Sequence, residues 1–376
     1  MVLGLYNHNG EWEPYETVRR NYLFLGKPRT GITETLTRLA LDDIHNDLPV
    51  VFIGKIGRIL DRIPFHRRKD ALVFNPEKQN FALNLIAKTD PQFHSLIAGE
   101  YTEAFKSISF DSKASTANVD QYFKASIQTL LTTPEATLLH ILTLLTDPTY
   151  REKAVQTVTD PYVLSFWEYF EARPEKDRAQ LIESTINKLW TFSFEPLIRE
   201  SLGQKTNHLT FKDKIVLIEL PETRIGRENA ALLGTLILAF LVVSGAEGVK
   251  TNLYVDDASR FGMTVIRDLL KTPGICTQLG LKYLYELDEP EMLMGAVDQI
   301  VAFRISGEDA KKIESEFYLG LQEHLYDQPD FHAYLAVGAR SVQLQMPMMD
   351  RPVNKGAAKK ILGRNLGEYT RRGRSG

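Results

Sequence analysis

Some segments of this 376-residue chain have the short apolar runs of buried strands, and others have the apolar spacing of helices. These patterns predict its secondary-structure elements. Short apolar runs typical of buried strands lie at residues 21–25, 49–53 and 71–74, and residues 34–45 between the first two have helical apolar spacing. Alternation of strand and helix predicts βαβ units and a parallel sheet. Residues 1–90 are therefore expected to form the first part of an α/β domain.

The centre of the chain, residues 91–205, keeps helical apolar spacing throughout and has no convincing strand. Pairs such as Asp-Pro and Thr-Pro interrupt it at turn positions. We therefore expect an all-helical insert here, followed by a second α/β stretch over residues 206–350. Strands are expected there at 214–220, 252–255, 299–303 and 331–337, and helices at 227–244 and 307–317. The predicted fold class is α/β.

Composition is that of a globular chain, with 43% hydrophobic and 25% charged residues and a net charge of −3. The lone Cys276 excludes an internal disulfide and suits a reducing compartment. The N-terminus lacks the pattern of a secretory signal. The most apolar segment, 230–243, has about 14 residues, too few to span a bilayer. We interpret it as a buried core helix and expect a cytoplasmic protein with no integral membrane segment.

Positive charge gathers at the end of the chain. Residues 351–376 hold eight Lys or Arg against one acid, Glu368. A basic C-terminal tail of this kind contacts DNA phosphates or an anionic membrane surface, or it is a disordered solubilising segment.

Residues 26–33, Gly-Lys-Pro-Arg-Thr-Gly-Ile-Thr, have the outline of a phosphate-binding P-loop, G-x-x-x-x-G-K-[ST]. In such a loop backbone N–H groups hold the phosphates, the lysine reaches the β and γ oxygens, and the hydroxyl holds Mg²⁺. Gly26, Gly31 and Thr33 fit, and the loop lies between a predicted strand and a predicted helix. Ile32, however, stands where the lysine should be. The candidate nucleotide-binding residues are Gly26, Lys27, Arg29, Thr30, Gly31, Ile32 and Thr33.

A second nucleotide motif is an apolar strand that ends in two acids, Asn252-Leu-Tyr-Val-Asp256-Asp257, in the form of a Walker B segment. In that segment the first carboxylate orients Mg²⁺ and a following glutamate positions the attacking water. Thr33 and Asp256 are therefore the candidate metal ligands, and Asp257 is a candidate catalytic residue. Asp257 is one methylene shorter than glutamate, and a misplacement of ~1 Å can cost about 10²-fold in rate. The alternative is a plain turn, which strands ending in Asp-Asp commonly start.

These motifs and their surroundings resemble the motor core of the conjugative coupling proteins of type IV secretion, in the FtsK–HerA superfamily of DNA-pumping ATPases. The similar segments run through nearly the whole chain: 22–33, 51–57, 74–76, 83–85, 138–147, 187–189, 214–220, 252–257, 302–304, 307–310 and 331–334. The resemblance implies a RecA-like P-loop sheet with an all-α insert, ATP with Mg²⁺, ring hexamers, and DNA threaded through the ring beside membrane-associated secretion machinery. It also implies that Arg304 bridges to a neighbouring subunit's phosphates. The other interpretation of Arg304 is an ion pair with Glu308 or Asp309.

The departures from the family pattern lie where the chemistry happens. Ile32 replaces the lysine, and Arg29 replaces a glycine, although a bulky residue resists the positive φ that such loops use. Gly54 and Arg58 stand at usually acidic positions, and the usual glutamine after Walker B is not evident in residues 282–286. A lysine–phosphate contact is worth ~1.5–3 kcal/mol in binding. Losing one charge-stabilising donor typically costs about 10²–10³ in rate.

The leading hypothesis from the sequence is thus a degenerate, hydrolysis-deficient relative of the coupling-protein ATPases. It would act as a DNA-associated or ring-forming accessory subunit in a homo- or hetero-oligomer, with ATP and Mg²⁺ bound weakly or not at all. Two alternatives stay open: a slow but active ATP-dependent DNA translocase, and a nucleotide-independent scaffold or adaptor.

Overall fold

The computed structural model describes residues 1–8, 11–78, 81–87, 89–107, 116–317, 322–337, 340–354 and 356–372. The chain divides into two compact units. Unit 1 comprises Met1–Val73, Thr210–Glu219 and Gly245–Asn365, and unit 2 comprises Phe74–Leu209, Leu220–Ser244 and Leu366–Gly376. The four-segment division drawn from the sequence stays a prediction.

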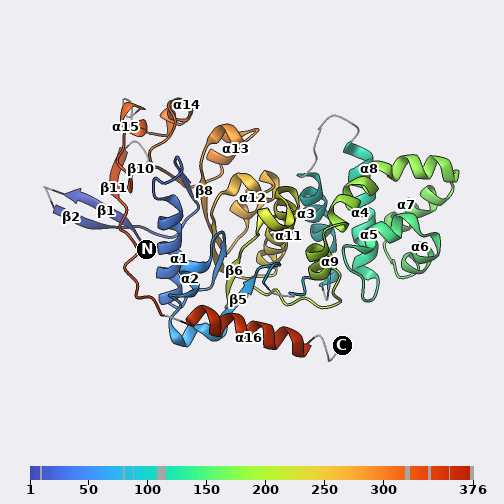
Figure 1. Ribbon diagram of the computed structural model, residues 1–376. Helices are drawn as coiled ribbons and strands as arrows, with labels where there is room; N and C mark the ends of the chain where they lie inside the picture. Colours follow the sequence, from blue (N-terminus) through green and yellow to red (C-terminus); the bar gives the residue numbers. More distant parts are fainter. Residues whose placement is uncertain are drawn as a thin grey trace. The chain divides into compact units, whose positions relative to one another are not determined.

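The described strands form one eleven-stranded sheet in the order β2-β1-β11-β10-β9-β3-β8-β7-β4-β6-β5 (Figure 1). Their bounds are β1 Val2–His8, β2 Glu11–Glu16, β3 Tyr22–Leu25, β4 Val50–Ile53, β5 Ala71–Phe74, β6 Ile215–Ile218, β7 Thr251–Val255, β8 Ile275–Leu281, β9 Gln299–Ala302, β10 His332–Val337 and β11 Arg340–Gln345.

The centre of the sheet is parallel, as the βαβ pattern predicts. Strand β3 pairs in parallel with β8 and β9, β7 pairs with β8 and β4, and β4 pairs with β6. Strands β3, β4, β6 and β7 are buried at every position, which explains their unbroken apolar runs. Because these strands are parallel, their carboxyl ends meet at one edge of the sheet.

An antiparallel extension, which the sequence analysis did not predict, continues the sheet beyond β9. Strand β10 pairs with β9 and β11, β11 pairs with β1, and β1 pairs with β2, all antiparallel. Gly4 interrupts the apolar pattern of β1, and a Cβ there would lie 3.1 Å from the backbone oxygen of Gln345. This close approach of two strands explains why a glycine stands inside a strand.

Helix α1 (Ile32–His45) follows the P-loop-like segment, and its apolar face, including Leu36, Leu39, Ala40 and Ile44, is buried in the core of unit 1. The other α-helices that lie mainly in unit 1 are α2 Gly57–Leu60, α12 Met263–Lys271, α13 Pro290–Met294, α14 Gly307–Lys312, α15 Gln322–Tyr326 and α16 Ala357–Arg372. Short 3₁₀ turns lie at Phe65–Asp70, Pro91–Phe93, Ala258–Arg260, Leu284–Glu286 and Glu314–Glu316.

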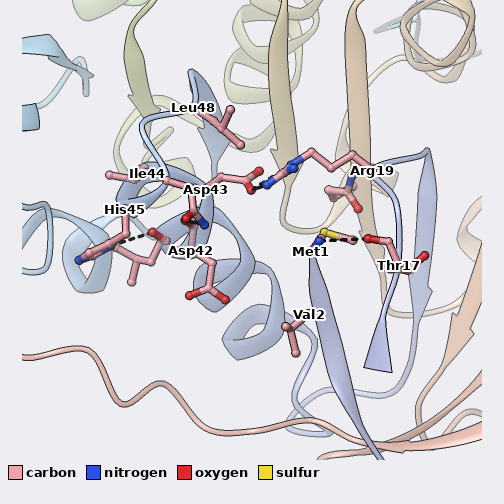
Figure 2. Close-up of polar contacts among 12 residues, drawn as sticks. Met1, Val2, Thr17, Arg19, Asp42, Asp43, Ile44, His45 and Leu48 are labelled. Atoms are coloured by element: carbon pink, nitrogen blue, oxygen red, sulfur yellow. Dashed lines mark hydrogen bonds and ion pairs between the residues drawn. The ribbon is translucent and has the colours of Figure 1, made fainter. Parts of the chain in front are cut away.

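A polar network fastens the N-terminal segment to α1. Figure 2 shows Arg19 extended toward Asp43 of α1, and its Nε lies 3.1 Å from Oδ1. The buried Tyr254 hydroxyl donates to the other oxygen of Asp43 at 2.7 Å. Arg38, also on α1, donates to the carbonyl oxygens of Val2 and Leu3 at 3.2 and 2.6 Å. These contacts hold the helix, and with it the loop at its N-terminus, against β1.

Helix α16 covers the open edge of β5. The Asn365 amide accepts the Val73 N–H at 2.9 Å and donates to the Ala71 carbonyl at 3.1 Å, so a side chain supplies the hydrogen bonds of a missing strand. Most of the predicted basic tail is therefore helical rather than disordered; Lys355 and residues 373–376 lie outside the described residues.

Unit 2 is helical, as predicted for the insert. Its helices are α3 His94–Lys106, α4 Thr116–Thr132, α5 His140–Thr146, α6 Pro148–Val155, α7 Pro161–Glu171, α8 Glu175–Ser193, α9 Pro196–Leu202, α10 Glu222–Ile225 and most of α11 Arg227–Ala246. The Asp-Pro pairs that interrupt the sequence are helix starts: Asp147 and Asp160 cap α6 and α7, each followed by proline at the first helical position.

Helix α11 corrects one prediction. The apolar segment was expected to be too short to span a bilayer, but the helix has 20 residues because it continues beyond the apolar run at both ends. By length and composition it is the one described helix that could cross a membrane, yet 78% of its most apolar window is buried. This burial is typical of a core helix.

Candidate nucleotide site

The carboxyl ends of the parallel strands in unit 1 border a cavity of about 570 Å³. Such a place, outside the carboxyl ends of an open parallel sheet, is where α/β folds bind ligands. Its lining comes from the loop after β3 and the start of α1 (Gly26, Lys27, Pro28, Arg29, Gly31, Ile32, Thr33, Glu34, Thr37), from the turn after β4 (Lys55, Gly57, Arg58), from Glu219 after β6, from Asp256 and Asp257 after β7, from Gly280 and Leu281 of β8 with Lys282 directly after it, and from Phe331.

Close packing and hydrogen bonds fix the loop between β3 and α1. A Cβ on Gly26 would lie 2.6 Å from Cβ of Phe303, so only glycine fits. Gly31 has φ 120° and forms the N-cap of α1, and the Thr30 hydroxyl donates to the Lys27 carbonyl at 2.7 Å. Phe331 N–H donates to the Thr30 carbonyl at 2.8 Å, which ties the loop to the start of β10.

Arg29 adopts the left-handed conformation that the sequence analysis expected a bulky residue to resist, with φ 72°. A non-glycine residue in this region costs about 1–2 kcal/mol. The hydrogen bonds around Thr30 and the packing of Gly26 hold the loop in place, so the backbone at Arg29 keeps this conformation. Arg29 is exposed and lines the cavity.

Ile32 is part of the hydrophobic core and does not supply a polar group. It is 9% exposed and clusters with Phe24, Leu36 and Phe303. Its Cγ2 lies 2.9 Å from the place that a Cβ on Gly280 would take, so the side chain fills the space between the loop and β8. At this position the side chain offers no donor to a phosphate oxygen.

Thr33 and Asp256 lie together, as the two motifs predict. The Thr33 hydroxyl donates to the two carboxylate oxygens of Asp256 at 3.0 and 3.1 Å. Burial raises the pKa of Asp256, and the Thr33 hydrogen bond and the charge of Lys282 oppose this shift. A hydroxyl beside a carboxylate is a donor set that suits Mg²⁺. A Cβ on Gly54 would lie 2.8 Å from Cβ of Asp256, so Gly54 makes room for this carboxylate.

Asp257 is held by neighbours on both carboxylate oxygens. It has φ 69° and pairs with Lys282 Nζ at 2.5 Å on Oδ2. The Ser259 hydroxyl lies 3.0 Å from its Oδ1 and is closer, at 2.7 Å, to the Glu286 carboxylate. The Asp257 side chain is 18% exposed and that of Lys282 is 46% exposed. In this structure Lys282 is the charged partner of Asp257.

The sequence analysis missed Lys282. This lysine directly follows β8, a strand that was not predicted because Gln278 and Gly280 break its apolar run. Lys282 is the first of residues 282–286, where the family pattern has a glutamine. The register of β8 against β3 places Lys282 beside the loop. Leu281, its neighbour, pairs with Leu25, and the Leu281 carbonyl accepts the Gly26 N–H at 3.1 Å.

Arg304 lies near the loop only through its backbone. Its carbonyl accepts the Lys27 N–H at 2.8 Å, but its side chain pairs with Asp330 at 2.7 Å and donates to the Gln328 carbonyl at 3.1 Å. The expected partners Glu308 and Asp309 were wrong, and Arg304 does not line the cavity. Its role at a subunit boundary stays a prediction.

No protein-family model and no curated protein matches the sequence. Solved structures do match. The bacterial conjugative coupling protein TrwBdeltaN70 superposes with a TM-score of 0.63 at 15% identity, over 93% of this chain and 89% of that one. The predicted fold is confirmed. The plasmid coupling protein TrwB in complex with ADP and Mg²⁺ gives a TM-score of 0.62 at 15% identity, covering 90% of this chain and 88% of that one.

VirB4 of Thermoanaerobacter pseudethanolicus has the same fold, with a TM-score of 0.61 at 13% identity over 93% of this chain and 96% of that one. The resemblance drawn from the sequence is thus confirmed at the level of the fold, a RecA-like P-loop sheet with an inserted helical domain. The matches cover nearly the full length of the solved chains.

Proposed function

We propose that this protein is a nucleotide-binding, hydrolysis-deficient relative of the type IV secretion coupling-protein ATPases. The observation that carries the proposal is the contrast inside one cavity. The Thr33–Asp256 pair and the loop around Gly26 and Gly31 keep a binding geometry, whereas Ile32 is packed into the core at the lysine position. The departures at positions 32 and 257 weaken binding by one contact and lower turnover more strongly, while Thr33, Asp256 and the backbone N–H groups can still hold a nucleotide.

Two defects act on turnover. Ile32 offers no charge to a transferring phosphoryl group, which typically costs about 10²–10³ in rate. Asp257, the candidate water-positioning group, is one methylene shorter than glutamate, and a base misplaced by ~1 Å costs about 10²-fold more. Together these defects lower hydrolysis by roughly 10⁴–10⁵ if they are independent. Bound nucleotide, held by backbone N–H groups, would then serve as a structural ligand.

Within this proposal ATP is the nucleotide and Mg²⁺ the ion, held by Thr33 and Asp256. The support is the donor set itself, together with the structures of TrwB that contain ADP and Mg²⁺ or a non-hydrolysable ATP analogue. The protein would act in the cytoplasm as an accessory subunit of a homo- or hetero-oligomeric ring associated with DNA, beside secretion machinery at the membrane, with an active paralogue supplying the motor.

Calorimetric titration with Mg²⁺-ATP, together with a phosphate-release assay in the presence and absence of DNA, tests the proposal. We expect measurable binding and turnover below ~0.1 s⁻¹, where typical enzymes run at 1–10³ s⁻¹. Thr33→Ala and Asp256→Asn should each weaken binding of Mg²⁺-ATP more than that of metal-free ATP. An absence of binding would favour a nucleotide-independent scaffold.

A slow but active DNA-translocating ATPase is the second candidate. The intact Thr33–Asp256 pair favours it, since this is the pair that places the ion. DNA-stimulated turnover above ~0.1 s⁻¹ that Asp257→Asn abolishes would establish this function and exclude the degenerate one.

A further inference from the structure

Lys282 stands in the cavity at a place where a cation can meet phosphate. It follows β8, the strand that lies between the loop strand β3 and the Walker B strand β7. Its ammonium contacts Asp257, while the same residue lines the cavity together with Gly26, Ile32 and Thr33. The side chain is therefore tethered at one end of a pocket whose other walls are the phosphate-binding elements.

We infer that Lys282 supplies, from the neighbouring strand, the positive charge that position 32 has lost, and that it binds the terminal phosphates of a nucleoside triphosphate. This inference rests on the proposed function, because it names a further binding residue of the same site. Ile32 packs against Gly280 instead of reaching over the loop, so no cationic side chain at position 32 competes with Lys282 for this part of the cavity.

Asp257 acts as the resting partner of this lysine. Without ligand, the ammonium pairs with the Asp257 carboxylate at 2.5 Å. A triphosphate carries more negative charge than one carboxylate and presents several acceptor oxygens, so it competes for the same ammonium. Binding of the triphosphate then exchanges one ion pair of Lys282 for another. The net gain in binding free energy is therefore smaller than for a lysine that has no partner before the ligand binds. The exchange predicts that this site binds nucleotide more weakly than a P-loop with its own lysine.

Two other cations of the cavity, Arg58 and Lys55, are less suited to this task than Lys282. Arg58 is already paired with Glu34 at the start of α1. Lys55 is exposed on the turn after β4, the strand on the far side of β7 from β8. Lys282 is the lysine whose ammonium lies beside Asp257, next to the Asp256 carboxylate that would orient the ion. The γ-phosphate of a bound triphosphate belongs at this end of the site.

The test compares ATP and adenosine binding by calorimetry in the full chain, for the wild type and for Lys282→Met, Lys282→Gln and Lys55→Met. We expect both Lys282 variants to weaken ATP binding about 10- to 100-fold while adenosine binding is unchanged. Lys55→Met, the matched control from the same cavity, should change ATP affinity by less than about 3-fold. Because the Lys282 side chain is half-exposed, both variants should fold like the wild type. Their unfolding curves check this expectation.

Two further variants separate a phosphate-binding lysine from a purely structural ion pair. Asp257→Asn releases the lysine, so it should strengthen ATP binding when Lys282 is present. The same substitution should not strengthen ATP binding in the Lys282→Met background. Ile32→Lys should restore ATP binding to Lys282→Met. Equal ATP affinity in the wild type and both Lys282 variants would overturn the inference and leave the proposed function standing. Absence of ATP binding in the wild type and in Ile32→Lys would instead remove the proposed function itself.

Discussion

Restoring the missing lysine is the change with the most informative outcome. In Ile32→Lys the aliphatic part of the new side chain can follow the apolar wall near Phe303 and Gly280, while its ammonium reaches the cavity that Ile32 already lines. Replacing a 9% exposed isoleucine in the core should lower the free energy of unfolding by about 1–3 kcal/mol. The fold should survive this change.

The binding gain follows from one charge-assisted contact. A lysine–phosphate hydrogen bond contributes ~1.5–3 kcal/mol, which corresponds to roughly 10- to 150-fold in ATP affinity. Because Lys282 already supplies a cation, we expect Ile32→Lys to raise ATP affinity by the lower end of this range when Lys282 is present. In the Lys282→Met background we expect the upper end. Adding Arg29→Gly relieves the backbone strain at φ 72°, although it also removes a cation from the cavity.

Calorimetric titration of Mg²⁺-ATP into Ile32→Lys, Ile32→Met and the wild type measures the effect. Ile32→Met keeps the core filled without adding charge, so it controls for repacking of the loop. If Ile32→Lys and Ile32→Met bind ATP equally, the loop does not present position 32 to phosphate, and the account of a degenerate phosphate site is refuted.

Three predictions concern stability, each measured by urea unfolding. Arg38→Met should lower the free energy of unfolding by about 2–4 kcal/mol, since the Val2 and Leu3 carbonyls lose a buried, charged donor; an unchanged midpoint would contradict the tie between α1 and β1. Burial raises the pKa of Tyr254 well above its ordinary value. The native state therefore keeps a proton that the unfolded chain releases, so stability from this group is full below about pH 10 and falls as pH rises above it. Tyr254→Phe should flatten that alkaline decline, and an equally steep decline in the variant would refute the assignment. Asn365→Leu should cost about 1–3 kcal/mol and promote self-association through the uncovered edge of β5, whereas a monomeric variant of full stability would show that α16 does not protect this edge.

Sequence patterns predicted the parts of the fold whose signals are local and strong. The unbroken apolar runs of β3, β4 and β7 identified buried parallel strands, and the glycines of the loop identified the turn into α1. Strand β8 was not predicted because its polar Gln278 is buried by tertiary contacts rather than by its own pattern. The β1–β2 hairpin was not predicted because half-exposed strands alternate weakly, and Gly4 interrupts the first of them.

At the candidate site, too, the sequence predicted what local motifs determine and missed what tertiary contacts determine. Thr33 and Asp256 were brought together by two motifs about 220 residues apart, because each motif has a set place on a P-loop sheet. The pairing of Asp257 with Lys282 and of Arg304 with Asp330 depends on side-chain placement across neighbouring strands and loops. No spacing in the sequence encodes those partners.

The most direct test of the account is a crystal structure of the full chain soaked with Mg²⁺ and a non-hydrolysable ATP analogue. The account predicts a triphosphate held by the backbone N–H groups of residues 29 and 31–33, an ion beside Thr33 and Asp256, and the Lys282 ammonium moved from Asp257 to a phosphate oxygen. A cavity left empty at saturating analogue, or a triphosphate bound with Lys282 still on Asp257, would contradict it.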